Sequence, residues 1–587
     1  MSRKKKPQRI GTIDCETDPF EPGVVIAPFL WGVMLDTGEY LEFEAVAELV
    51  AWMCLPAQDG LILYAHNGGK FDYHFLRDSI EPDEPISVIA GRLARCKIGG
   101  VELRDSLNLF GQTRLADFSK KEIDYRKMLA SERRKPEVWA EIREYLKYDC
   151  ESLLKLVSSF FDKFGMHFTQ AGAAMKYWKK HYAPQNEVPQ STVGFYDRFH
   201  PFYFGGRVQC FEHGHAREKF SVIDINSAYP FAMLSEHAYS VDSPLTTSRL
   251  PKNESSIAQC LIEVDAVAKG CFPLRARDGS LYFPDDESTV RTYHVTGWEL
   301  LAGLETNAVK VHRIRACHQF NRQTSFKGYV EHFFAARRAA KAAGDKAEDI
   351  FAKIFLNALY GKFASNPRKY REFVLSELGT ESYAKWIAAG YQEEGLWGSR
   401  SMLFRPLPES KHRYYSVATG ASITGYVRAH LWRALNKVGG AIYCDTDGIA
   451  ARDVSQIDTG PNIGQWKIEA ECDEYAIGGK KNYAFHVKDT PRNSFVQRQK
   501  PLSNPRSADE WAKGRKSWKI ASKGADLTPK QMMRIARGGE FNYKSSVPNF
   551  SMHLPMPGTY APGTLDRSFQ NRLVKSTYRD ISQMEAA

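Results

Sequence analysis

Acidic residues recur along the chain at spacings that suit metal ions and phosphoryl transfer. The clearest set lies in Tyr443-Cys444-Asp445-Thr446-Asp447-Gly448, which short apolar runs flank on both sides, as at the tip of a β-hairpin. Side chains alternate between the two faces of a strand, so we expect Asp445 and Asp447 on one face. Two adjacent carboxylates favour a hard divalent cation. Acidic turns also form for backbone reasons alone, so the motif has to be weighed with the rest of the chain.

A second acidic set occupies the first 170 residues. Asp14 and Glu16 lie two apart in a predicted strand over 9–17, and Asp72 follows the glycine turn after a predicted strand over 61–66. Asp149 comes one helical turn after Tyr145 in a helical pattern from 136 to about 161. Each carboxylate alone is typical of a solvated surface. Together they suit two cations about 3.5 to 4 Å apart that stabilise the attacking and leaving oxygens of a phosphodiester.

The middle of the chain adds side chains suited to nucleotides. Asp224 lies near the end of a predicted strand that runs into a turn at Pro230. Lys353, Asn357 and Tyr360 fall at i, i+4 and i+7, so one face of a predicted helix carries a cation, an amide and a ring. Taken alone, this face is also typical of an amphipathic surface helix.

Length and composition limit the class of protein. A chain of 587 residues predicts roughly three to five domains. Its 80 Lys and Arg exceed 69 Asp and Glu, and the net charge of +11 favours a polyanionic partner. The ten cysteines lack zinc-finger spacing, which indicates reduced thiols. There is no apolar run of membrane length and no apolar stretch after the basic N-terminus, so we expect a cytoplasmic protein, in the host cell if it is viral.

In their order, these motifs resemble those of the protein-primed family-B DNA polymerases of phages, adenoviruses and linear plasmids. Asp-x-Glu, Asn-x-x-x-Phe-Asp and Tyr-x-x-x-Asp are similar to the 3′→5′ proofreading exonuclease of that family. The segments around Asp224, Lys353 and Asp447 resemble polymerase motifs A, B and C, with Ala228, Ala358 and Gly448 replacing the usual Leu, Ser and Ser. The resemblance implies an α/β multidomain fold, with an RNase H-like exonuclease domain and a palm, fingers and thumb carrying two insertions.

The resemblance also implies roles at the polymerase site. Metal would bind to Asp224, Asp447 and the Ile225 carbonyl, with Asp445 as a supporting acid. The incoming nucleotide would meet Lys353, Asn357, Tyr360 and Tyr229, whose ring leaves no room for a 2′-hydroxyl. DNA would contact the Tyr-x-Gly-Gly and Lys-x-Tyr motifs, that is, Tyr203, Gly205, Gly206, Lys481 and Tyr483.

At the exonuclease site the resemblance implies four metal ligands, Asp14, Glu16, Asp72 and Asp149. Tyr145 would orient the attacking water. The frayed 3′ end would be held by Thr17, Asn67 and Phe71, and Lys120 would touch the scissile phosphate. Each of the two active sites is expected to use two Mg²⁺ or Mn²⁺ ions, with deoxynucleoside triphosphates as substrates of the polymerase.

The expected domains follow from the motif positions. They are an exonuclease domain (1–170), a linker and first palm part (171–242), a first insertion (243–326), fingers (327–367), a second insertion (368–413), a second palm part (414–519) and a thumb (520–587). In the protein-primed branch the first insertion docks a terminal protein and the second supports strand displacement. Ordinary elaboration of palm and fingers is the alternative.

The expected partners are primer-template and single-stranded DNA, a terminal protein that offers a hydroxyl as primer, and a single-strand-binding protein. Two other functions stay open. One is a primer-independent family-B polymerase. The other is a nuclease or nucleic-acid-binding protein with a degenerate palm, which Gly448 and Ala358 suggest.

Overall fold

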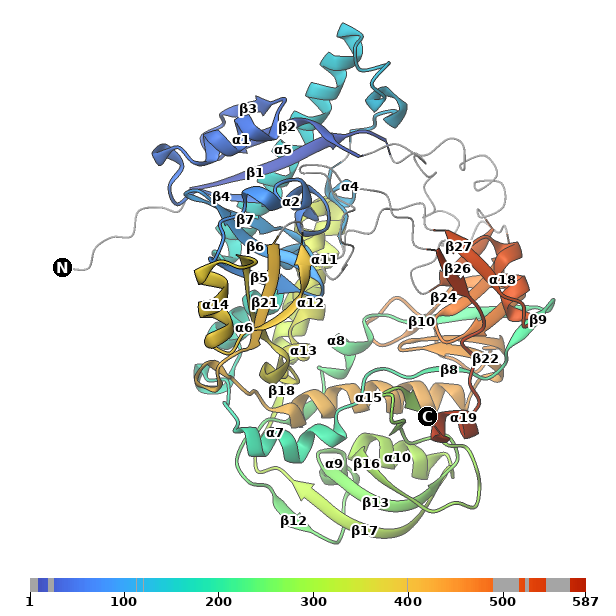
Figure 1. Ribbon diagram of the computed structural model, residues 1–587. Helices are drawn as coiled ribbons and strands as arrows, with labels where there is room; N and C mark the ends of the chain where they lie inside the picture. The colour runs from blue at the N-terminus through green and yellow to red at the C-terminus, as the bar shows by residue number, and fades with distance from the viewer. Residues whose placement is uncertain are drawn as a thin grey trace.

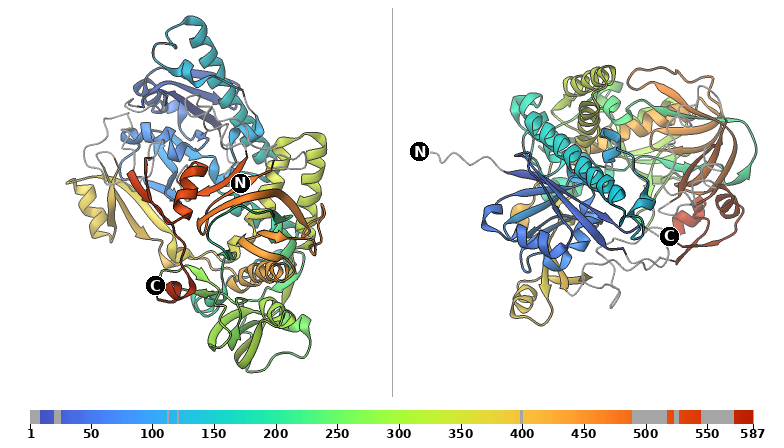
Figure 2. Two further views of the ribbon diagram at one scale, coloured as in Figure 1. Left: turned by 90° about the vertical axis from the view of Figure 1, so that its right-hand side faces the viewer. Right: turned by 90° about the horizontal axis from the view of Figure 1, so that it is seen from above.

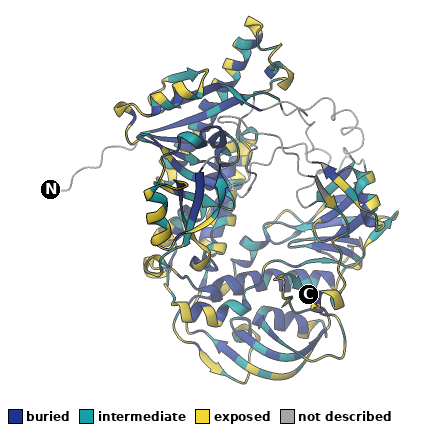
Figure 3. Cartoon of the chain, in the orientation of Figure 1, coloured by how far each residue is buried: buried dark blue, intermediate teal, exposed yellow. Residues whose placement is uncertain are grey.

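A computed structural model describes residues 9–19, 26–111, 113–119, 121–397, 400–488, 517–522, 527–544 and 571–586. Figure 1 shows the N-terminal sheet at the top left, a second sheet at the right and a smaller sheet at the bottom. The helix α15 (Val417–Leu435) runs between the second sheet and the smaller one. Most of its residues are buried, as Figure 3 shows, so α15 is a central, buried helix of the molecule.

The N-terminal sheet has ten strands in the order β20-β21-β19-β5-β6-β7-β4-β1-β2-β3. The strands from the first segment are β1 (Ile10–Thr17), β2 (Pro28–Leu35), β3 (Tyr40–Phe43), β4 (Ile62–Ala65), β5 (Pro85–Ile89), β6 (Arg92–Ile98) and β7 (Val101–Asp105). The long helix α5 (Pro136–Phe164) packs against it, and Thr12 Oγ1 donates to the Cys150 carbonyl at 2.8 Å. The predicted strands over 9–17 and 61–66 and the helix from 136 are therefore confirmed.

Three strands of this sheet come from much later in the chain. They are β19 (Arg371–Glu377), β20 (Gln392–Trp397) and β21 (Arg400–Pro406), with α14 (Glu381–Ala388) between β19 and β20. β19 pairs antiparallel with β5, opposite Pro85 and Ile86. Both views in Figure 2 keep this gold segment beside the blue sheet. The sequence analysis assigned residues 368–413 to a second insertion and did not anticipate that they extend the first sheet.

The second sheet has eight strands, ordered β26-β25-β24-β10-β23-β22-β8, with β9 on β24. Their bounds are β8 (Val208–Cys210), β9 (Gly214–Ala216), β10 (Phe220–Ile225), β22 (Gly439–Asp445), β23 (Gly448–Asp453), β24 (Trp466–Gly479), β25 (Asn482–Val487) and β26 (Trp518–Ser522). β10 lies between β23 and β24, so acidic residues at its end face the β22–β23 hairpin.

Two antiparallel helices, α11 (Lys327–Ala343) and α12 (Lys346–Ala358), turn at Gly344 and are followed by α13 (Tyr360–Phe363). Gly344 has a φ of 72°, which favours glycine. The hairpin is fixed by Tyr329, whose hydroxyl donates to the Phe355 carbonyl at 2.8 Å. Phe355 also stacks on Phe164 of α5 at 4.2 Å between ring centroids. One apolar core therefore joins the first segment to these helices.

The smaller sheet lies within residues 243–326 and has the order β12-β17-β13-β16. Its elements are β12 (Leu245–Thr247), β13 (Leu261–Ala268), β16 (Arg291–Thr296), α10 (Gly297–Glu305) and β17 (Val309–Gln319). α10 packs on α15 through a buried ion pair between Glu299 Oε1 and Arg428 Nε at 2.7 Å. Near the C-terminus the described residues form α18 (Pro529–Ala536), β27 (Phe541–Lys544), β28 (Asn571–Val574) and α19 (Ile581–Ala586). No helix in the described ranges has both the length and the apolar character to cross a membrane.

Candidate active sites

Backbone pairing joins the hairpin turn Thr446-Asp447 to the end of β10. The Ile225 amide donates to the Asp447 carbonyl at 2.9 Å, and Asp224 pairs with Gly448. Thr446 has a φ of 61°, and the Asp447 amide donates to the Asp445 carbonyl at 2.6 Å. Asp447 is thus a turn residue, so the expectation that strand alternation aligns it with Asp445 was wrong. The turn geometry and the bond to β10 place it instead.

Three carboxylates gather at this turn with two lysines beside them. Lys467 Nζ lies 3.0 Å from Asp224 Oδ2, and Lys481 Nζ lies 3.1 Å from Asp445 Oδ1. Burial, and then the charges of Asp224 and Asp445, raise the pKa of Asp447 to about 7. Burial also raises the pKa of Asp224, against the attraction of Lys467. The two lysines leave the mutual repulsion at Asp447 uncompensated, which is the electrostatic setting of a cation site.

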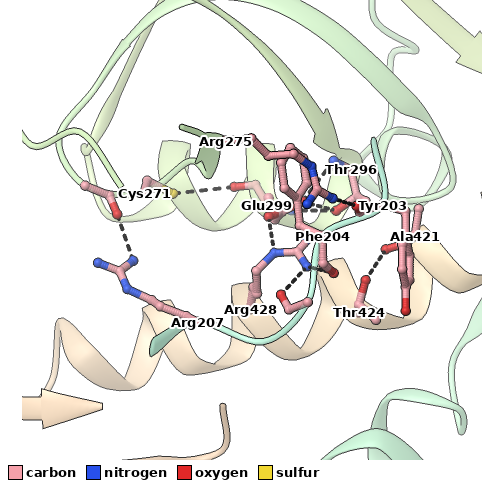
Figure 4. Close-up of polar contacts among 12 residues, drawn as sticks. Tyr203, Phe204, Arg207, Cys271, Arg275, Thr296, Glu299, Ala421, Thr424 and Arg428 are labelled. Carbon is pink, nitrogen blue, oxygen red and sulfur yellow. Dashed lines mark hydrogen bonds and ion pairs between the residues drawn. The ribbon is translucent and has the colours of Figure 1, made fainter. Parts of the chain in front are cut away.

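The Tyr-x-Gly-Gly segment passes directly beside this turn. A Cβ on Gly206 would lie 2.7 Å from Thr446 Cγ2, so only glycine fits there. The Thr446 amide donates to the Arg207 carbonyl at 2.6 Å. Arg207 is itself buried, and its Nη1 donates to the Gly270 carbonyl at 2.7 Å, just after β13 (Figure 4). The sequence analysis missed Arg207, whose only signal was its place after the two glycines.

Arg428 of α15 is a second residue that the sequence analysis missed. Its Nη1 donates to the carbonyls of Phe204 at 2.6 Å and Gly205 at 2.9 Å, while its Nε bonds Glu299 (Figure 4). Both ionised side chains are only 2% exposed, so the pair depends on these bonds to offset its burial. The glycine segment is thereby held between α15 and α10. The sequence contains no signal of this role, because a single Arg in a helix does not show which carbonyls it will bind.

The predicted nucleotide-binding residues lie on α8 (Ala228–Ala232), α12 and α13. The Tyr229 and Tyr360 rings stack at 4.2 Å with an angle of 9° between planes. Burial raises the pKa of both hydroxyls, and the Asp447 charge adds to this effect, so the ring pair lies near the carboxylates. Lys353 and Asn357 are exposed on α12 and line a cavity of about 430 Å³ between α12 and the first segment.

The Lys-x-Tyr motif begins in the turn between β24 and β25, and its Tyr483 lies on β25. Lys481 has a φ of 55°, and its amide donates to the Tyr443 hydroxyl at 2.9 Å. The Tyr483 ring lies 4.9 Å from the Tyr443 ring. With its ion pair to Asp445, Lys481 therefore sits at the rim of the carboxylate cluster.

The second candidate site brings together all four acids that the sequence analysis predicted. Asp14 and Glu16 lie on β1, Asp72 begins α2 (Asp72–Phe75) and Asp149 lies on α5. Burial, followed by the charges of the other three, raises the pKa of Asp14 well above its usual range. Burial raises the pKa values of Asp72 and Asp149 to about 6. Asp72 Oδ1 is buried without a hydrogen-bond partner among the described residues.

Aromatic hydroxyls flank this cluster. The Tyr145 side chain bonds Asp149, which lowers the pKa of that carboxyl against the effect of burial. Its hydroxyl also lies 3.3 Å from that of Tyr125, which the sequence analysis missed because it belongs to no motif. Burial, and then the charges of Glu16, Asp149 and Asp14, raise the pKa of Tyr125, so its ring lies close to the acids.

The remaining predicted residues lie around the same site, with one exception. Thr17 ends β1, and Asn67 and Phe71 flank the short turn before α2. Asn67 has a φ of 65°, a conformation that Asn tolerates better than most residues. Lys120 lies outside the described residues.

Comparison with known proteins places the chain in a family. Residues 112–435, more than half of the chain, match the model of the family "DNA polymerase type B, organellar and viral". The chain belongs to this family of type B DNA polymerases. Its similarity to a phage enzyme runs almost end to end, since the DNA-directed DNA polymerase of Enterobacteria phage PRD1 is 33% identical over 94% of this chain and 97% of the phage protein.

More distant members and solved structures agree with this assignment. A DNA polymerase of Kluyveromyces lactis is 22% identical over 54% of this chain and 33% of that protein. The Phi29 DNA polymerase, in its complex with primer-template DNA and incoming nucleotides, superposes with a TM-score of 0.69 at 18% identity, covering 97% of this chain and all of that one. The predicted family resemblance, the fold class and the activity of a DNA-directed DNA polymerase are confirmed.

Type B DNA polymerases depend on divalent metal ions and act on DNA. In the described ranges no three His, Cys, Asp or Glu side chains are arranged tightly enough to enclose an ion. The chemistry nevertheless fits, because both clusters offer carboxylate oxygens, which Mg²⁺ and Mn²⁺ prefer. The unpartnered Asp72 Oδ1 and the raised pKa of Asp447 are features that a cation would satisfy.

Proposed function

We propose that this DNA polymerase extends a primer at the cluster of Asp224, Asp445 and Asp447. The supporting observation is the bond from the Ile225 amide to the Asp447 carbonyl, which fixes two acidic segments against each other. Asp224, Asp447 and the Ile225 carbonyl would hold two Mg²⁺ or Mn²⁺ ions. When bound, these ions stabilise the charge on the attacking primer 3′-oxygen and on the leaving pyrophosphate.

The side chains around the cluster complete this proposal. Lys353 neutralises triphosphate charge, and Asn357 and Tyr360 frame the incoming nucleotide. Tyr229 rests against Tyr360 and excludes a ribose 2′-hydroxyl. The DNA-holding residues are Lys481 and Tyr483 at the primer terminus and Tyr203, Gly205 and Gly206 at the template.

We propose a separate 3′→5′ exonuclease at Asp14, Glu16, Asp72 and Asp149. It is supported by the shared negative charge of the four buried or half-buried acids and by the bond from Tyr145 to Asp149. Tyr145 orients the attacking water, and Thr17, Asn67 and Phe71 hold the frayed 3′ end. This activity removes nucleotides that the polymerase site misincorporates.

We also propose that synthesis starts on a terminal protein bound by residues 243–326. One feature that supports this is β17, which carries Lys310, His312, Arg313 and Arg315 as exposed basic side chains. The resemblance of the motifs to those of the protein-primed branch also favours it. A single-strand-binding protein would cover the strand that synthesis displaces.

The test is extension of a primed single-stranded template with deoxynucleotides, with and without Mg²⁺. A circular single strand without primer reveals primer-independent initiation. Incubation with a candidate terminal protein and labelled deoxynucleotide reveals covalent label on a Ser, Thr or Tyr hydroxyl. Absence of label on any protein encoded beside this one would count against protein priming and leave primer extension standing.

A further inference from the structure

The second insertion, residues 368–413, shares its packing with the N-terminal domain. β19 adds to the edge of β5, and the Asp83 amide donates to the Leu375 carbonyl at 2.7 Å. Residues 368–413, called insertion 2 below, contribute side chains to the apolar core that also contains residues of β1, β4 and α2. These side chains are Phe373, Leu375, Trp397 and Met402. The insertion is thus built into the domain that carries the exonuclease acids.

Polar contacts hold the same junction. Asp83 Oδ1 accepts from Ser376 Oγ at 2.7 Å and from Trp386 Nε1 at 2.9 Å. The buried Arg400 side chain donates to the carbonyls of Ile80 and, at 3.1 Å, Asp78. These bonds tie insertion 2 to the segment between α2 and β5, so the two parts move together.

One contact reaches the exonuclease acids more directly. The Trp397 ring meets the His74 ring edge to face at 5.3 Å, and Trp397 Nε1 lies 3.4 Å from His74 Nδ1. An indole nitrogen can only donate, so Nδ1 accepts and the imidazole carries its proton on Nε2. That Nε2 lies 3.3 Å from the Gly69 carbonyl, to which it donates. Trp397 and His74 are 6% and 4% exposed, so water does not replace these bonds.

His74 therefore stands between insertion 2 and the two pieces of backbone that present exonuclease residues. It belongs to α2, whose first residue is Asp72, and its bond to Gly69 fixes the turn that follows Asn67. Gly69 is packed closely against β6, because a Cβ there would lie 2.1 Å from the Leu93 carbonyl. A shift of the His74 ring is thus passed to α2 and to this turn.

We propose that insertion 2 is part of the exonuclease site and that Trp397 is a positioning residue for Asp72, acting through His74. The proposal rests on the exonuclease function proposed above. It gives the insertion a role in proofreading besides the strand displacement expected of it, because its Trp397 then helps to hold the backbone that presents Asp72. Partners that orient a ligand typically change metal affinity or activity about 10- to 100-fold when removed.

The test uses the full-length enzyme with Trp397→Phe, which keeps a ring and removes the N–H. We expect degradation of single-stranded DNA to slow about tenfold, with a higher Mn²⁺ concentration needed for half-maximal rate. Extension of a primed single-stranded template should be unchanged. The matched control is Trp386→Phe, which removes another indole N–H between insertion 2 and the N-terminal domain, and we expect it to leave the exonuclease unchanged.

A double variant with His74→Phe should lose no more exonuclease activity than His74→Phe alone, because both changes cut one link. If Trp397→Phe lowers the melting temperature, His74→Asn tests the same link, since it keeps an acceptor for Trp397 and loses the donor to Gly69. The proposal is overturned if Trp397→Phe leaves the rate and Mn²⁺ dependence unchanged, or if Trp386→Phe slows the exonuclease equally. Exonuclease that survives Asp72→Ala would instead refute the site assignment.

Discussion

The Ile225 amide donates to the Asp447 carbonyl at 2.9 Å, which joins the strand of one acid to the turn of another. Because the bond is made by backbone, the relative position of Asp224 and Asp447 does not depend on their side chains. Removing either carboxylate should therefore leave the fold of the palm intact. Variants that lack one of these carboxylates should therefore fold, and their activities can be measured in folded protein.

The two active sites should be separable by mutation. Asp447→Ala is expected to lower primer extension roughly a thousandfold, because several kcal/mol of charge stabilisation are lost. It should spare degradation of single-stranded DNA. Asp14→Ala with Asp72→Ala should do the reverse. Loss of both activities in Asp447→Ala, with an unchanged circular dichroism spectrum, would contradict the assignment.

Sugar selection should depend on the Tyr229 ring. Tyr229→Val is expected to raise ribonucleotide incorporation relative to deoxynucleotide on the order of tenfold or more, measured as the ratio of kcat/KM values. Tyr229→Phe is the control, because it keeps the ring that stacks on Tyr360 and should keep the discrimination. An equal ratio in all three enzymes would place the gate elsewhere.

Glycines near the polymerase turn should differ in their tolerance of a side chain. A Cβ on Gly448 would lie 3.4 Å from the Ile223 carbonyl and 3.8 Å from Asp224 Oδ1, both ordinary contacts. Gly448→Ser should therefore preserve the melting temperature and primer extension. Gly206→Ala should impair extension and spare the exonuclease, because its Cβ would clash with Thr446. Equal effects of the two changes would refute this reading of the turn.

Metal ions should stabilise the protein more at higher pH. The pKa values of Asp72 and Asp149, about 6, and of Asp447, about 7, lie above 3.8, so the metal-free folded state binds more protons than the unfolded state between these values. Its stability therefore falls as pH rises from about 4 to 7. Mn²⁺ should bind the ionised acids and so reverse this loss.

Melting temperatures with and without Mn²⁺ at pH 5.5 and 7.5 provide the measurement. We expect the shift caused by Mn²⁺ to be larger at pH 7.5. A variant with Asp72→Asn, Asp149→Asn and Asp447→Asn should show a much smaller difference between the two pH values. A shift that is the same at both pH values in the unmodified protein would contradict the prediction.

The elements that carry the sites were predictable because their signals are local. β1 alternates apolar and acidic residues from Ile13 to Glu16, β4 is a short apolar run followed by a glycine turn, and α5 shows helical periodicity along its whole length. Asp14 and Glu16 lie on β1, Asp72 begins α2 just after β4 and its glycine turn, and Asp149 lies on α5, so each acid is carried by or directly follows an element with a local signal. Once these elements were recognised in the sequence, the acids that they carry could be assigned to a shared site.

The partners of these acids were not predictable, because they come from distant segments without motifs. Nothing in the sequence around Lys467 marks it as a partner of Asp224. The two residues meet because β24 pairs with β10. The same holds for Arg207 and Arg428, whose bonds depend on how helices and loops pack. Pairing of β19 with β5 has no local signal, because either strand could have lain at a free edge.

The shared sheet has a consequence for how the protein is made. The edge of β5 is covered by β19, which a ribosome synthesises on the order of tens of seconds later, at about 5–20 residues per second. Until then the nascent N-terminal domain presents an open strand edge and an unfilled core, a known hazard for aggregation. Residues 371–406, which extend this sheet, thus leave the ribosome long after the strands that they join. We expect a fragment ending at residue 170 to need a chaperone or a supplied 368–413 segment to stay in solution.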